Sequence, residues 1–271
     1  MKMRTLGRSI ICLVIGFIFV IPILLILMNA FKPNREIMTS FISFPRSLYL
    51  GNFQEAIRAM NFGLALTNTV KVTLLTVLTA VSICYCAAYA IAHLPKKLAN
   101  IVYMSFIFGQ LIPFHTVMIA ISVQSTKLGL NNTHLGLILF NAGFFSAFGI
   151  ITYVGALKTV PLELEDSAAI DGASQLRTMV QIILPLLKPS TMTIGVLFFL
   201  WTWNDYLLPN ILIGKNELRT VTVQLYLFKG TTNAEWNLLM AGVTMSMVPI
   251  VIVYLLAQKY IVSGMTAGAI K

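Results

Sequence analysis

The hydrophobic pattern of the chain consists of long runs without a charged side chain, separated by shorter polar stretches. The six longest runs hold 155 of the 271 residues and a single charge, that of Asp205. They cover residues 9–31, 72–95, 98–126, 128–157, 189–214 and 236–258. A helix that crosses a bilayer needs about 20 mainly apolar residues, and every run is longer than that. The pattern predicts an all-α, polytopic six-helix transmembrane bundle in one domain, residues 1–271, with spans at about 9–30, 67–92, 98–122, 134–157, 190–212 and 239–261.

Composition excludes several classes of protein. The chain is 58% hydrophobic and 10% charged, with a mean hydropathy of +0.85, whereas a soluble domain has about 25% charged residues. Strands of an outer-membrane barrel would be about 10 residues long and would alternate apolar with polar positions. The three cysteines lie inside apolar runs, without the spacing of a metal or redox site. A soluble enzyme, a disulfide-bonded secreted domain and an outer-membrane barrel are therefore excluded.

The first apolar run is expected to remain as a span. It follows Lys2, Arg4 and Arg8, as the apolar core of a signal peptide would, but it is 23 residues long and does not end in a small-residue cleavage site. A cytoplasmic N-terminus would place 10 Lys and Arg residues inside and 9 outside, so the positive-inside rule favours this orientation only through the first flank. The net charge of +10 is scattered between the spans, which suits anionic lipid headgroups and not nucleic acid.

Two patterns within the spans concern helix packing. Small residues recur at a spacing of four in the second span, where they would let another membrane helix approach closely: Ala80, Cys84, Ala88 and Ala92. Four prolines stand within spans or at their edges, where a missing N–H group is expected to kink the helix: Pro22, Pro113, Pro209 and Pro249.

The segment 158–189, between the fourth and fifth spans, reads as two helices with a break. Pro161 suits a first turn, and the acids that follow favour the positive end of a helix dipole. Gly172 is placed to end that helix, and Ser174 can cap the next. An apolar face is predicted on the second helix, which Pro185 ends, from Leu176, Met179, Val180, Ile183 and Leu184. Patterning alone would also suit an amphipathic helix that rests on lipid.

Catalytic chemistry is scarce. The three histidines, His93, His115 and His134, share no metal-ligand spacing and adjoin no nucleophile motif, so interfacial or packing roles are expected for them. Gly214-Lys215 looks like the end of a phosphate-binding loop, but Pro209 stands where the first glycine of that loop belongs. We therefore expect no catalytic residue, no metal site and no cofactor on this chain, and any ATP must bind to another chain.

One motif in the 158–189 segment resembles a known family. Asp166-Ser167-Ala168, Gly172, Ile182, Leu184 and Pro185 keep every spacing of the loop signature of binding-protein-dependent ABC importer permeases, with Asp for Glu and Ser for Ala. Further motifs are similar to its carbohydrate-uptake branch, and above all to the smaller membrane subunit of maltose-type transporters. These motifs are Phe31-Lys32-Pro33, Ala87-Ala88-Tyr89-Ala90, Gly129-Leu130-Asn131-Asn132-Thr133, Trp203-Asn204-Asp205-Tyr206 and the tail 263–269.

The resemblance implies the fold of a type I ABC importer permease and a role as one half of the pore of an ATP-driven sugar importer, for an oligosaccharide. It implies a bacterial inner or plasma membrane location, cytoplasmic termini and a cytoplasmic 158–189 loop. Its partners would be ABC ATPase subunits that carry ATP and Mg²⁺, a second homologous permease, and an extracytoplasmic sugar-binding protein that docks on the outer loops 31–66 and 213–238. The residues expected to couple to the ATPase are Glu163, Asp166, Ser167, Ala168, Asp171 and Gly172.

The same resemblance makes Trp203, Asn204, Asp205 and Tyr206 candidates for the pore or substrate site. Asp205 is the one acid within a span, which marks it as functional. It also lies near the predicted outer interface, beside Trp201, Trp203 and Tyr206, which fit an aromatic belt. A structural or gating role and direct contact with sugar both remain open for Asp205. Two alternatives for the whole chain are an ion-coupled secondary transporter, for which the sequence barely offers a coupling acid, and a membrane hydrolase, for which no nucleophile–base pair is present.

Overall fold

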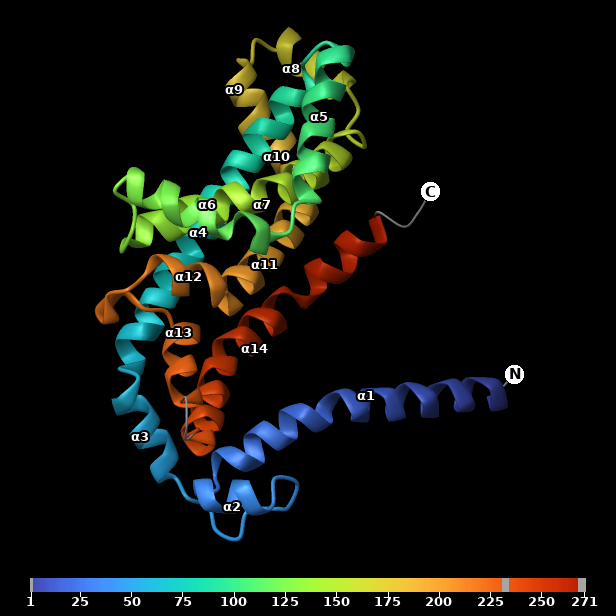
Figure 1. Cartoon of the computed structure of the whole chain (residues 1–271). Coiled ribbons are helices and arrows are strands. Elements are labelled where there is room, and N and C mark those ends of the chain that lie inside the picture. Colours follow the sequence, from blue (N-terminus) through green and yellow to red (C-terminus); the bar gives the residue numbers. More distant parts are fainter. Residues whose placement is uncertain (1, 231–233, 268–271) are drawn as a thin grey trace. The chain divides into compact units, whose positions relative to one another are not determined.

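Helices and their connecting turns make up the computed structural model, which describes residues 2–230 and 234–267 (Figure 1). Within these residues there is no strand, and the predicted all-α fold is confirmed. The α-helices are α1 (Lys2–Ala30), α2 (Asn34–Thr39), α3 (Gly51–Ala59), α4 (Phe62–Ala92), α5 (Lys96–Gln110), α6 (Phe114–Lys127), α7 (His134–Leu157), α8 (Glu163–Ile170), α9 (Gln175–Arg177), α10 (Leu184–Leu186), α11 (Lys188–Asn204), α12 (Leu207–Leu212), α13 (Val221–Tyr226) and α14 (Trp236–Ala267). A π-helical turn, η1 (Thr178–Ile183), and two 3-10 turns, η2 (Asn216–Leu218) and η3 (Leu227–Lys229), complete them.

The described helices include candidates for the predicted spans. Four are long and apolar enough to cross a membrane, at Ile11–Ala30, Phe62–Ala92, His134–Leu157 and Trp236–Gln258. Two more spans are possible as bent pairs, α5 with α6 and Gln175–Leu186 with α11. The part of the chain that the structure describes therefore offers four to six membrane helices.

Proline and extended backbone explain where the bent spans differ from straight helices. The α5–α6 pair bends by 100°, and Pro113 stands directly before α6, where it lacks a backbone N–H and disfavours helix at Ile112. The predicted span 190–212 is also interrupted, because α11 ends at Asn204 and the backbone of Asp205 is extended. Helices α1 and α14 continue through Pro22 and Pro249.

The chain divides into two compact units, Met1–Leu66 with Thr220–Pro249, and Thr67–Arg219 with Ile250–Lys271. Both contain parts of the candidate spans α4 and α14, and the single transmembrane domain stays a prediction.

Buried polar groups organise the first unit. Lys32, from the Phe31-Lys32-Pro33 motif, is completely buried, and its Nζ donates hydrogen bonds to the carbonyls of Ser40 and Phe41 at 3.0 and 3.2 Å. The buried amide of Asn52 donates to the carbonyls of Ala30 and Lys32, each at 2.8 Å. Asn52 belongs to the short helix α3, in the loop 31–66 that follows the first span. These bonds hold the loop that follows α1 in a defined shape.

Residues of α4, α7, η1 and α11 form the core of the second unit, and α4 and α7 approach closely within it. Ala80, Cys84 and Ala88 are completely buried in its core, whereas Ala92, the fourth small residue, is exposed. A Cβ placed on Gly149 of α7 would lie 2.5 Å from the Sγ of Cys84. The stripe of small residues thus lets α7 approach, as its spacing of four predicts.

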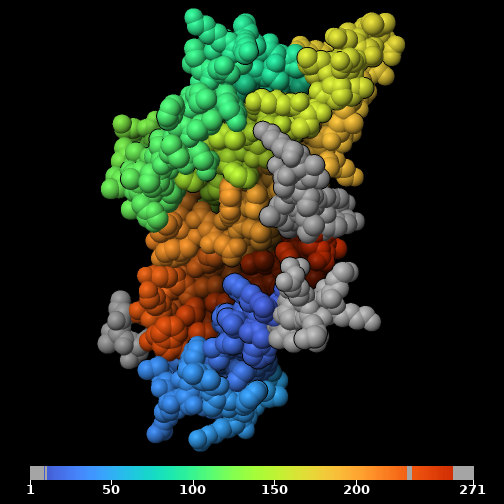
Figure 2. Space-filling model, turned by 90° about the vertical axis from the view of Figure 1, so that its right-hand side faces the viewer, coloured from blue at the N-terminus to red at the C-terminus, as the bar shows by residue number. Residues whose placement is uncertain are grey.

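Large apolar side chains remain exposed outside these cores. On α5 no residue is buried, and Leu98, Ile101 and Phe108 are 46–67% exposed. Figure 2 shows α5 and α6 (green) at the surface of the face in view. Apolar side chains on a membrane helix face lipid tails without the cost that water would impose.

Candidate functional site

The 158–189 loop begins with α8, which a glycine ends. Gly172 has a φ of +77°, in the left-handed region that only glycine enters without strain. Its N–H donates to the carbonyl of Ala169 at 3.1 Å, and the N–H of Ala173 donates to that of Ala168 at 2.9 Å. These two bonds are the Schellman arrangement that closes a helix. The predicted stop at Gly172 is therefore confirmed.

The second half of the loop follows the sequence prediction at its start and departs from it later. The Oγ of Ser174 caps α9 by accepting the N–H of Arg177 at 3.4 Å. From Thr178 to Ile183 the chain forms the π turn η1, whose wider turn rotates the side chains that follow. Ile183 is consequently buried, while Leu176 and Val180 of the predicted apolar face are 68% and 45% exposed.

Most of the predicted coupling residues lie on the solvent-exposed face of α8 and of the turn that follows it. Glu163, Asp166, Ser167, Asp171 and Gly172 are exposed. Exposed with them is Ile170, whose side chain is 87% accessible. Ala168 points inward and is 5% exposed. The Oγ of Ser167 donates to the carbonyl of Glu163 at 2.7 Å, so this hydroxyl is bound within the helix.

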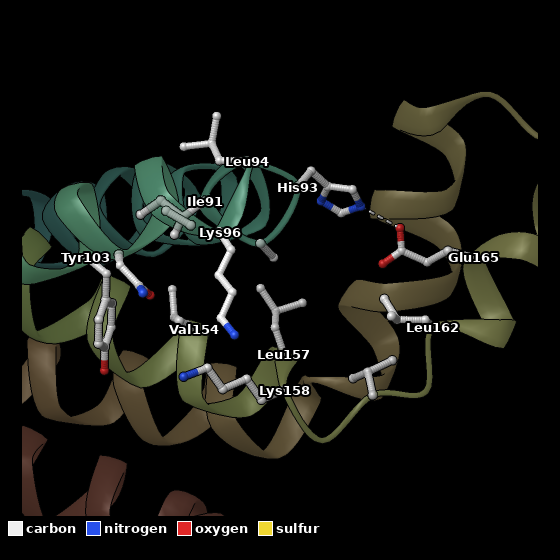
Figure 3. Close-up of a pocket in the computed structure, with 14 residues that line it drawn as sticks. Ile91, His93, Leu94, Lys96, Tyr103, Val154, Leu157, Lys158, Leu162 and Glu165 are labelled. Carbon is white, nitrogen blue, oxygen red and sulfur yellow. Dashed lines mark hydrogen bonds and ion pairs between the residues drawn. The ribbon is translucent and has the colours of Figure 1, made fainter.

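Glu165, which the sequence analysis does not single out, attaches α8 to the end of α4 (Figure 3). Its Oε2 lies 2.8 Å from the Nε2 of His93 and accepts the hydroxyl of Tyr89 at 3.0 Å. The Nδ1 of His93 lies 2.8 Å from the carbonyl of Tyr89. Since a carbonyl and a carboxylate both accept, both ring nitrogens donate, which is the pattern of an imidazolium. Tyr89 of α4 and His93, directly after its end, are four residues apart, and this spacing is the signal that sequence reasoning missed.

The same contacts set the charge of His93. Burial lowers the pKa of His93, but the hydrogen bonds to the Tyr89 carbonyl and to Glu165, together with the charge of Glu165, outweigh it. The pKa of His93 is therefore raised above its ordinary value of 6.5.

Tyrosines tie the rest of the loop to the core of the second unit. The hydroxyl of Tyr85 on α4 donates to the carbonyl of Met179 in η1 at 2.6 Å. The hydroxyl of Tyr153 on α7 donates to the Oγ1 of Thr191 on α11 at 2.9 Å, and the two tyrosine rings are 5.5 Å apart. The loop is thus hydrogen-bonded to α4, and α7 is hydrogen-bonded to α11 just past the end of the loop.

A second feature is a cavity of about 540 Å³ at the far end of α11. Aromatic rings dominate its lining, and amides, a carboxylate and an imidazole supply polar groups. The polar members are Gln110, His115, Asn141, Asn204 and Asp205, and the aromatic members are Phe114, Phe144, Phe145, Phe148 and Trp201. An apolar, aromatic cavity with a few convergent polar groups is the usual form of a small-molecule site.

Two of the four predicted substrate candidates line this cavity. Asn204 and Asp205 line it, whereas Trp203 is 3% exposed and stacks on Phe199 at 5.4 Å between ring centroids. Tyr206 is not among its lining residues. Trp201 lines the cavity instead, and its side chain is 38% exposed. Its ring centroid lies 5.3 Å from that of Phe145 and 5.1 Å from that of Phe148. Trp201 and Asp205 are four residues apart, a spacing that would have placed them together on a helix.

Asp205 has a structural contact as well as a place in the cavity. One carboxylate oxygen accepts the backbone N–H of Leu208 in the first turn of α12 at 3.3 Å, and the side chain of Asn141 lies beside it. The structure thus supports the structural alternative for Asp205 and leaves direct contact with a ligand open. Among the described residues, no group of three His, Cys, Asp or Glu side chains could hold a metal ion.

Comparison with known families decides the class of protein. Residues 80–267 match the family model of the binding-protein-dependent transport system inner membrane component. The chain belongs to this family. The permease is 39% identical over 259 residues to a probable starch degradation products transport system permease protein of Thermoanaerobacterium thermosulfurigenes, covering 96% of this chain and 94% of that relative. It is 34% identical to the multiple sugar-binding transport system permease protein of Streptococcus mutans, covering 100% and 98%.

A solved structure gives the same fold. The permease superimposes with a TM-score of 0.82 on a chain of a bacterial ABC transporter that imports the acidic polysaccharide alginate, at 20% identity and over 96% of each chain. The expected fold of a type I ABC importer permease is therefore confirmed, as is the resemblance drawn from the loop motif. The family assignment disfavours the secondary transporter and hydrolase alternatives.

Proposed function

We propose that this permease forms half of the translocation pore of an ATP-driven importer for oligosaccharides. The observation that carries the proposal is the path from the 158–189 loop to the aromatic cavity. Helix α11 starts at Lys188, at the end of this loop, and ends beside the cavity, about 24 Å away at 1.5 Å per residue. A rigid helix between the two places allows a movement of the loop to change the cavity.

The solvent-exposed face of α8 suits a docking site for an ATPase subunit. It combines three acids, Glu163, Asp166 and Asp171, with the exposed apolar side chain of Ile170. An exposed apolar side chain surrounded by charged residues matches the apolar centre and polar rim of a protein interface. ATP and Mg²⁺ would bind to the ATPase, and this chain would contribute no catalytic residue. Glu165, through His93, would act as a positioning residue for α8.

The cavity beside Trp201 suits a sugar. Aromatic faces pack against the C–H surfaces of a sugar ring, while the amides of Gln110 and Asn204 can bind its hydroxyls. The names of the relatives refer to starch degradation products, multiple sugars and, for a 30% identical protein of Streptomyces coelicolor, diacetylchitobiose. These names support an oligosaccharide as the substrate class.

The proposal also includes the orientation and the remaining partners. Both termini and the 158–189 loop would be cytoplasmic, and the outer loops 31–66 and 213–238 would receive a sugar-binding protein. A related fold is known from an alginate transporter in complex with its periplasmic protein, at 17% identity and a TM-score of 0.69. Residues 231–233 of the second outer loop and 268–269 of the tail motif lie outside the described residues.

Purification of the tagged permease from its native host tests the assembly. We expect an ABC ATPase and a second six-span permease to co-purify, and sugar uptake in liposomes to require ATP and the binding protein. Asp166→Lys should reduce the co-purified ATPase about tenfold, because it reverses a charge on the docking surface. Glu217→Lys, an exposed charge reversal outside the 158–189 loop, is the matched control. Uptake by the permease alone, without an ATPase, would contradict the proposed function.

A further inference from the structure

A second cavity, of about 440 Å³, lies where three candidate membrane helices begin or end (Figure 3). Helix α4 ends at Ala92, α7 ends at Leu157 and α5 starts at Lys96. The cavity is lined by residues next to each of these ends, namely His93, Lys96 and Lys158, and by Leu162 and Glu165 of the following loop. The ends of apolar spans mark the boundary between hydrocarbon and headgroups. The cavity therefore lies at the depth of lipid phosphate groups.

Two lysines give the cavity a positive charge. Figure 3 shows the side chains of Lys96 and Lys158 directed into it from α5 and from the end of α7. The Nζ of Lys158 lies 5.5 Å from the ring centroid of Tyr103, and this cation–π contact helps to hold the lysine side chain in place. Within the described residues, the ion pair of His93 with Glu165 is the one found, so neither lysine has a carboxylate partner there. The acid that lines the cavity, Glu165, is bound to His93 and Tyr89.

The remaining wall of the cavity is largely apolar. Ile91, Val154 and Val160 line the interior. Leu94 and Leu157, at or next to the ends of α4 and α7, extend this apolar lining. A ligand with an anionic head and apolar chains would satisfy the lysines and the apolar lining at once, whereas a free anion would use the lysines alone.

We propose that this cavity binds the phosphate group of an anionic phospholipid, with Lys96 and Lys158 as its counter-charges. The acyl chains then start against the apolar lining of the cavity. Juxtamembrane lysines attract anionic lipid by about 1 kcal/mol each, and a cavity between helix ends adds hydrogen bonds and shape. Because Glu165 lines the same cavity, the bound lipid lies next to the contact that attaches α8 to α4.

Native mass spectrometry of the full chain in detergent tests this proposal, with phosphatidylglycerol and phosphatidylcholine as probes. The wild type should retain phosphatidylglycerol in preference to phosphatidylcholine. The double variant Lys96→Gln/Lys158→Gln should bind phosphatidylglycerol at least about tenfold more weakly, since two charges are lost. Lys97→Gln/Lys188→Gln removes the same charge from exposed lysines that do not line the cavity, and its binding should equal that of the wild type.

Two further arms make the result decisive. Ala99→Phe fills the cavity without changing its charge and should also weaken phosphatidylglycerol binding, with size-exclusion chromatography to check the fold. Inorganic phosphate in millimolar excess should not displace the lipid; displacement would assign the site to a free anion and overturn the lipid source. Equal retention of phosphatidylglycerol by the wild type and the Lys96→Gln/Lys158→Gln variant would overturn the site itself.

Discussion

The Nε2 of His93 and the Oε2 of Glu165 lie 2.8 Å apart, although 72 residues separate them in the chain. This pair joins the end of a candidate membrane helix, α4, to the exposed helix α8. A charged His93 makes the bond an ion pair, and a neutral His93 loses that charge interaction. The attachment of α8 therefore depends on pH.

The first prediction is that hydrogen exchange of the α8 backbone increases as pH rises. Because the pKa of His93 is raised in the folded protein, its stabilising contribution is complete below the unfolded value of 6.5 and is lost as pH rises through the folded pKa. Exchange of α8, corrected for the intrinsic pH effect, should be slowest below about pH 6.5 and faster above the folded pKa. Deuterium exchange with mass spectrometry measures it.

Matched variants isolate His93 in this experiment. His93→Arg keeps a positive charge at all accessible pH values and should abolish the dependence, whereas His93→Gln should give fast exchange throughout. His115→Gln changes a histidine that does not contact α8 and should leave the profile as it is. An unchanged profile in His93→Arg would contradict this role.

The second prediction concerns Gly172 and the coupling of ATP hydrolysis to transport. Nothing lies within 4 Å of a Cβ added there, so Gly172→Ala meets only the backbone cost of a positive φ, about 1–2 kcal/mol. Gly172→Pro in addition removes the N–H that donates to Ala169. We expect the sugar transported per ATP to fall severalfold in Gly172→Ala and to vanish in Gly172→Pro.

Reconstituted transporter with parallel uptake and phosphate-release assays gives this ratio. Gly155→Ala is the control. Gly155 lies inside α7, nothing lies within 4 Å of an added Cβ, and the variant should keep the ratio. Coupling that survives intact in Gly172→Pro would contradict the role of the α8 stop.

The third prediction tests the close approach of α4 and α7. A Cβ at Gly149 would lie 2.5 Å from the Sγ and 2.9 Å from the Cβ of Cys84, so Gly149→Ala must push the helices apart. Overpacking of this kind costs about 1–3 kcal/mol. Gly143 lies on the same helix with nothing within 4 Å of its Cβ, and Gly143→Ala should be neutral or slightly stabilising. Thermal unfolding in detergent should separate the two variants by several degrees, and equal midpoints would contradict the packing.

Local chemistry explains why the sequence predicts so much of this fold. The spans can be predicted because burying a charge in hydrocarbon is costly, so each span is a run without charged residues or nearly so. The stop at Gly172 and the cap at Ser174 depend on bonds between residues three to five apart, and the stripe from Ala80 to Ala88 depends on helical period alone. Such features need no knowledge of distant segments.

Features that depend on distant segments are the ones the sequence did not predict. The contact of Glu165 with His93 requires the loop to return to the end of α4. The π turn η1 shifts the apolar face away from Leu176, and its carbonyl at Met179 is bound by Tyr85, far away on α4. The coupling roles of α8 and the sugar contacts of Asn204 and Asp205 remain predictions.

The last prediction separates the two neighbouring tryptophans. Trp201 lines the 540 Å³ cavity and stands beside Phe145 and Phe148, whereas Trp203 is buried against Phe199. Trp201→Ala removes an aromatic face from the proposed sugar site, and we expect the KM for sugar-loaded binding protein to rise, or uptake at low sugar to fall, about tenfold. Basal ATP hydrolysis should stay within about twofold, because α8 is untouched.

Trp201→Phe keeps an aromatic face and should restore most of the uptake, which a purely structural role in membrane anchoring would not require. Trp203→Ala should instead lower the unfolding temperature, since its ring is 3% exposed and its loss leaves a void in the core. Uptake and thermal unfolding measured on the same preparations distinguish the two outcomes. If Trp201→Ala and Trp203→Ala both reduce stability and neither changes the sugar dependence of uptake, the cavity at the end of α11 is not the sugar site.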